Sequence, residues 1–165
     1  SYPFVLKALA DVFNYSDFSK GQKPELEPQL ADLLKKLMDL STSLDITNDE
    51  DLSFGNMFYT YLCQTFTGYA RVYYDREDLQ KERDQLFMLD KLSNYIWKLS
   101  PKIDADLIKS FVKTAKQFAE NCSRRNNVIL NRHSVHRVLK FGFENSRNQD
   151  MKREIKNTID YLKSR

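Results

Sequence analysis

The sequence predicts an all-α protein: a compact bundle, or a short stack, of about six to seven antiparallel helices with no sheet. Apolar residues recur at three- and four-residue spacing along almost the whole chain, which is the pattern of amphipathic helices. Gly and Pro number only four each among 165 residues, fewer than the many turns of a sandwich or a barrel require. This length suits one domain. We therefore expect residues 1–165 to form a single all-helical domain, and the missing initiating Met suggests a fragment of a larger protein.

The first part of the chain predicts two helices. Pro3 suits a first helical turn and is followed by a short apolar stripe. Gly21 is a stop signal, and Pro28 then begins a second helix over about 28–45. The apolar face of this second helix consists of Leu30, Leu33, Leu34, Leu37, Met38 and Leu44.

A long helix over about 49–74 is expected next. Thr47 and Glu50 have the spacing of a capping box at its start. At 100° per residue its aromatic and apolar residues fall within an arc of about 140°, which predicts a core face that touches two neighbouring helices. Tyr59 and Tyr74 lie outside this arc. We therefore expect them to be exposed anchors for a protein partner, since Tyr is enriched at binding sites.

Two more helices follow in the middle of the sequence. The pattern predicts one over about 76–99 that ends at Ser100 and Pro101, because the residue before proline avoids the helical region. Asp104 is then a suitable N-cap for a helix whose apolar stripe is the cleanest in the chain and runs to Cys122.

The last two predicted helices follow a break in the pattern. Apolar spacing indicates one helix over about 127–144. Asn148 is a candidate cap for the final helix. Its apolar residues include Met151, Ile155, Ile159 and Leu162.

Catalytic motifs are missing from the sequence. It contains no phosphate-binding, dinucleotide-binding or nucleophile-elbow motif. His133 and His136 share a helix face, but zinc requires a third and usually a fourth ligand. Cys63 and Cys122 lie in or beside apolar stripes, where a thiolate is disfavoured; two buried thiols are the favoured interpretation and one disulfide is the alternative. We therefore predict no enzymatic activity, no cofactor, no bound metal and no small-molecule substrate.

Targeting signals are also missing. No apolar run approaches the roughly 18 residues of a membrane helix, and no signal peptide opens the sequence. We therefore expect no membrane insertion, and a location inside the cell, in the cytoplasm or the nucleus.

The charge of the chain is unevenly distributed. Residues 124–165 hold eleven Lys or Arg and four Asp or Glu, a net +7, which leaves −4 for residues 1–123 within the total of +3. On a helix, several of the basic side chains fall within an arc of about 80° and form a stripe suited to phosphates. The alternative is a solvated face neutralised by the acidic part of the chain. The candidate residues for a nucleic acid or an acidic partner are Arg124, Arg125, Arg132, His136, Arg137 and Lys140.

Three hypotheses for the function follow. The first is a non-enzymatic protein–protein interaction or scaffold domain that binds a partner helix or peptide. The alternative is nucleic-acid binding, in particular RNA binding, through the basic segment 124–140. The third, which the missing motifs disfavour, is an enzyme or metal protein that uses His133 and His136.

Overall fold

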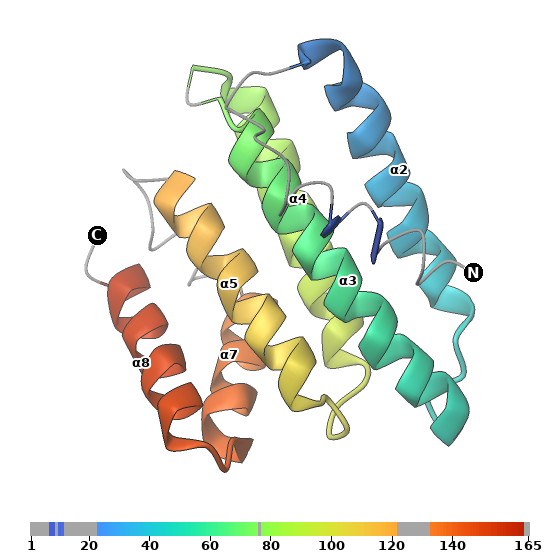
Figure 1. The fold of residues 1–165 in the computed structure, drawn as a ribbon, viewed down its shortest axis with the longest axis vertical. Helices are drawn as coiled ribbons and strands as arrows, with labels where there is room; N and C mark the ends of the chain where they lie inside the picture. Colours follow the sequence, from blue (N-terminus) through green and yellow to red (C-terminus); the bar gives the residue numbers. More distant parts are fainter. Residues whose placement is uncertain (1–6, 9, 12–22, 76, 122–132, 164–165) are drawn as a thin grey trace.

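The computed structural model confirms the all-α class. It describes residues 7, 8, 10, 11, 23–75, 77–121 and 133–163, and within these ranges it contains six α-helices and no strand (Figure 1). The α-helices are α2 (Glu27–Leu40), α3 (Asp49–Tyr73), α4 (Leu79–Trp97), α5 (Ala105–Asn121), α7 (His133–Asn145) and α8 (Gln149–Lys163), and two short 3-10 helices are η1 (Pro24–Leu26) and η2 (Ser41–Ser43).

The helices pack as a short stack of neighbours. Figure 1 shows α3, α5 and α8 side by side, with α4 and α7 behind them and α2 along the outer side of α3 and α4. Helix α5 contacts α3, α7 and α8, and α4 contacts α7. The last two helices are thus joined to the rest of the molecule through α5 and α4. Within the described residues, no helix combines the length and the apolar character needed to cross a membrane.

Helix α3 buries a wider face than the sequence predicts. Tyr59 is 3% exposed and Tyr74 is 7% exposed, so the expectation that these two side chains are exposed anchors is wrong. The reason is that α2, α4 and α5 all pack on α3, whereas the predicted arc allowed for two neighbours. The Tyr59 hydroxyl donates a hydrogen bond to the Ser41 hydroxyl of η2, and burial raises the pKa of Tyr59 to about 12.

The cap of α3 is Asn48 and not Thr47. The side-chain oxygen of Asn48 accepts hydrogen bonds from the backbone N–H groups of Glu50 and Asp51. The Thr47 hydroxyl instead donates to the carboxylate of Asp45 in the preceding turn. The helix begins one residue later than a cap at Thr47 requires.

Two predicted caps are confirmed. The carboxylate of Asp104 accepts a hydrogen bond from the Leu107 N–H at the start of α5. The side chain of Asn148 accepts hydrogen bonds from the N–H groups of Asp150 and Met151 at the start of α8.

Two predicted boundaries differ from the observed ones. Helix α2 ends at Leu40, because the hydroxyls of Ser41, Thr42 and Ser43 each bond back to a carbonyl three residues earlier and the chain tightens into η2. Helix α4 begins at Leu79, where Asp78 accepts a hydrogen bond from the Lys81 N–H. Residues 127–132 of the predicted helix 127–144 lie outside the described residues.

Gly142 of α7 lies where this helix packs tightly against α5 and α8. A Cβ atom at this position would lie 2.6 Å from Cγ2 of Ile108 in α5 and 3.3 Å from Cδ1 of Ile155 in α8. Real Cβ atoms do not come within 3.0 Å of such neighbours. The missing side chain therefore allows α5, α7 and α8 to meet at one point.

Gly142→Ala is expected to lower the free energy of unfolding by about 1–3 kcal/mol through overpacking. In a helix with free space at this position, replacing Gly by Ala would instead stabilise the protein by about 1 kcal/mol. The sign of the change therefore tests the close packing at Gly142. Urea denaturation measures the change. Ile108→Leu removes the Cγ2 methyl group that lies closest to position 142 and is expected to reduce the loss of stability caused by Gly142→Ala. A more stable Gly142→Ala variant would contradict the close approach.

Asn48→Ala removes the two hydrogen bonds at the start of α3 and is expected to destabilise the protein by about 0.5–2 kcal/mol. Thr47→Ala is the matched control, and we expect a smaller loss because Thr47 does not cap the helix. Thermal or urea denaturation of both variants gives the comparison. A larger loss of stability in Thr47→Ala than in Asn48→Ala would show that Thr47 caps the helix.

Candidate functional site

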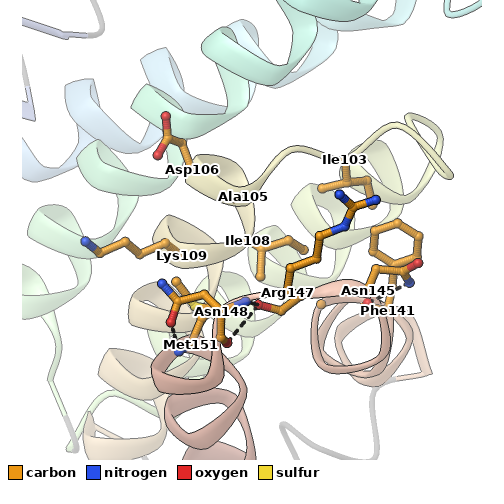
Figure 2. A pocket seen from close by; sticks show the side chains of 12 residues that line it. Ile103, Ala105, Asp106, Ile108, Lys109, Phe141, Asn145, Arg147, Asn148 and Met151 are labelled. Carbon is orange, nitrogen blue, oxygen red and sulfur yellow. Dashed lines mark hydrogen bonds between the residues drawn. The ribbon is translucent and has the colours of Figure 1, made fainter.

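A groove of about 500 Å³ lies where the start of α5 meets the end of α7 and the start of α8 (Figure 2). This volume falls within the range of about 300–1,000 Å³ that is usual for ligand-binding clefts. Its apolar lining residues are Ile103, Ala105, Ile108, Phe141, Gly142 and Met151, and its polar ones are Asp106, Lys109, Asn145, Ser146, Arg147 and Asn148.

The floor of the groove is apolar and comes from three parts of the fold. Ile103 precedes α5 and Ile108 lies in its first turn, and both are buried, at 8% and 5% exposure. Phe141 of α7 and Met151 of α8 are half-buried. The half-buried pair offers apolar area that a bound side chain can cover.

The part of the floor at Ile103 is held in place by the buried side chain of Asn56 in α3. Its amide nitrogen donates to the carbonyls of Leu52 and Lys102, at 3.0 and 2.9 Å. Its oxygen accepts from the Asp104 N–H at 2.9 Å. Asn56 therefore fixes the residues on both sides of Ile103 to the centre of the fold.

The loop between α7 and α8 is held by its own hydrogen bonds. The Ser146 N–H donates to the Gly142 carbonyl, and the Asn148 N–H donates to the Ser146 hydroxyl. Asn148 then caps α8. Arg147, between them, is carried on a backbone that is bonded on both sides.

Arg147 is the charged side chain that reaches across the groove. Figure 2 shows it extending from the α7–α8 loop toward Ile103, whereas Asp106 and Lys109 point away from it. Asp106 and Lys109 lie at the edge of the groove opposite Ile103, and their charges are opposite in sign. Within the described part of the chain, Arg147 has no ion pair or side-chain hydrogen bond. The groove therefore combines an apolar floor with one unpaired guanidinium.

The aromatic surface continues from the groove along α7. The rings of Phe141 and Trp97 meet edge to face, with their centroids 6.1 Å apart. The guanidinium of Arg137 lies over the Trp97 ring, 4.8 Å from its centroid. The Nε atom of Arg137 is buried and has no hydrogen-bond partner among the described residues.

The predicted basic stripe is placed only in part. Arg124, Arg125 and Arg132 lie outside the described residues. Of the others, His136 is half-buried, Arg137 stacks on Trp97, and exposed Lys140 lies 3.9 Å from the carboxylate of Glu144.

The groove itself was not predicted from the sequence. Its residues come from the segments 103–109 and 141–151, which are far apart in the chain, and Arg147 counted only as one of many basic residues. Two features of the sequence point to this region: Gly142 interrupts an apolar helical pattern, and a polar loop precedes the cap residue Asn148.

The described residues offer little for metal or thiol chemistry. No group of three or more His, Cys, Asp or Glu side chains gathers among them in a way that could hold a metal ion. The Cys63 thiol is buried, and burial raises its pKa to about 12. Cys122 lies outside the described residues, so the question of a disulfide is untested.

Comparison with protein-family models, with curated proteins and with solved structures finds no match to this chain.

Cys63 is expected to resist thiol reagents in the folded protein. With a pKa near 12 the thiol stays protonated at pH 8, and the thiolate is the reactive form. In a Cys122→Ser variant, the disulfide-exchange reagent DTNB should label no thiol before unfolding and one thiol in guanidinium. Rapid labelling of the folded variant would contradict the burial of Cys63.

The raised pKa of Cys63 also predicts how stability depends on pH. Above about pH 9 the unfolded chain releases the thiol proton while the folded chain keeps it, so the free energy of unfolding should fall as the pH rises.

Proposed function

We propose that this chain is a non-enzymatic helical interaction domain that holds a short segment of a partner protein in the groove between α5, α7 and α8. The observation that carries the proposal is the groove itself: an apolar floor from three elements, with a polar rim and an adjoining Trp–Arg pair. Clefts of this kind are the usual binding sites for peptides and ligands.

The composition of the adjoining surface supports a protein partner. Trp, Tyr and Arg carry much of the binding energy in protein interfaces. Trp97, Arg137 and Phe141 lie in contact along one edge, and all three are half-buried. Such groups are already partly ordered, so binding costs less side-chain entropy.

The chemistry of the lining supports a binding role and not a catalytic one. The Ser146 hydroxyl donates to the carbonyl of Asn148, and no histidine or cysteine is found among the described lining residues. A nucleophile paired with a base is the arrangement that covalent catalysis requires. The proposal places the domain in the cytoplasm or the nucleus.

Nucleic-acid binding through 124–140 remains the alternative. Two of the described candidates already have partners, since Arg137 stacks on Trp97 and Lys140 lies near Glu144. Fluorescence anisotropy of labelled single-stranded RNA and duplex DNA at increasing salt is the test. Saturable binding that weakens linearly in log salt would favour this alternative.

Ala105→Phe is expected to fill the groove from the exposed start of α5 without entering the core. Random twelve-residue peptides displayed on phage are selected on the unchanged protein, and the recovered peptides are then synthesised. We expect Ala105→Phe to weaken their binding at least about tenfold, which is about 1.4 kcal/mol.

The matched control for this variant is Ser53→Phe, which adds the same ring at an exposed position of α3. Circular dichroism shows that both variants are folded. Peptides that bind Ala105→Phe as tightly as the unchanged protein would place the binding site elsewhere.

A further inference from the structure

We infer that the partner segment is acidic and apolar, and that it places a carboxylate on Arg147 while its apolar side chains enter the groove. This inference rests on the proposed function and specifies the chemistry of the partner.

Arg147 is suited to recognise a carboxylate. Its side chain reaches across the groove toward Ile103 (Figure 2), and it has no ion pair within the described residues. A guanidinium offers two parallel N–H groups to a carboxylate, and such bidentate pairs are among the strongest hydrogen bonds in proteins.

The charges around Arg147 favour the same partner. At the far edge of the groove Asp106 and Lys109 offset each other, and on α7 Lys140 lies near Glu144. On α8 the Lys152 ammonium lies over the ring of Phe143. Among the described residues that line the groove, the charged ones are Asp106, Lys109 and Arg147, a net +1. This positive charge favours an anionic segment over a cationic one.

The floor distinguishes an acidic peptide from a nucleic acid. Ile103, Ile108, Phe141 and Met151 offer apolar contact, which the charged phosphate backbone of a nucleic acid does not use. A peptide with aliphatic or aromatic side chains covers these residues and carries the carboxylate on the same short segment. An acidic peptide with apolar side chains therefore matches both the guanidinium of Arg147 and the apolar floor.

The experiment begins with phage-displayed random twelve-residue peptides selected on the full 165-residue chain. We expect the recovered peptides to carry net negative charge and several apolar residues. Their dissociation constants, measured by fluorescence anisotropy as synthetic peptides, should rise at least about tenfold in Arg147→Gln. The control is Lys156→Gln, which removes one exposed positive charge from α8 outside the groove. It should change the dissociation constants less than about twofold, the small effect expected of a distant surface charge.

A charge reversal gives a second, independent readout. Arg147→Glu should bind peptides in which Lys replaces the Asp and Glu residues better than it binds the original acidic peptides. Arg147 is an exposed loop residue, so both variants should fold, and the fluorescence of Trp97, the single Trp in the chain, checks this.

The outcomes separate the two proposals. If Ala105→Phe removes binding, but the recovered peptides are neutral or basic or Arg147→Gln leaves their affinity unchanged, the acidic partner is wrong and the binding groove stands. If no peptide is recovered, or if none responds to Ala105→Phe, both proposals fail.

Discussion

The structure of the last third of the chain depends on the close contact between α5 and α7 at Gly142. Because position 142 has no side chain, Ile108 of α5 and Ile155 of α8 both reach the α7 backbone. This contact brings the α7–α8 loop next to the start of α5, and the groove is the space that remains between them. A larger residue at position 142 would separate the helices that form the floor.

The groove is also tied to the centre of the molecule. Asn56 bonds to the backbone on both sides of Ile103, and the Ser134 hydroxyl at the start of α7 donates to the carboxylate of Asp90 in α4 at 2.6 Å. Asn56 thus ties one side of the groove to α3, and the Ser134–Asp90 hydrogen bond ties the start of α7, the end away from the groove, to α4.

The sequence predicts the helices better than it predicts their surroundings. Asp104 and Asn148 were recognisable as caps because capping is decided within a few residues. Tyr59 was misjudged because periodicity defines a face but does not reveal how many helices cover it. The groove was not foreseen because it joins segments about 40 residues apart, and because the contact at Gly142 is a property of three helices and not of one.

The most direct test of this account is a nuclear magnetic resonance titration of methyl-labelled protein with one of the selected peptides. With the methyl groups of Ile and Met labelled, we predict chemical-shift changes centred on Ile103, Ile108 and Met151, the Ile and Met side chains that line the groove. The methyl groups of Met38 and Met88, which are buried in α2 and α4 and do not line the groove, should remain unchanged. Changes centred instead on Ile46 or Met57, exposed apolar side chains outside the groove, would contradict the account.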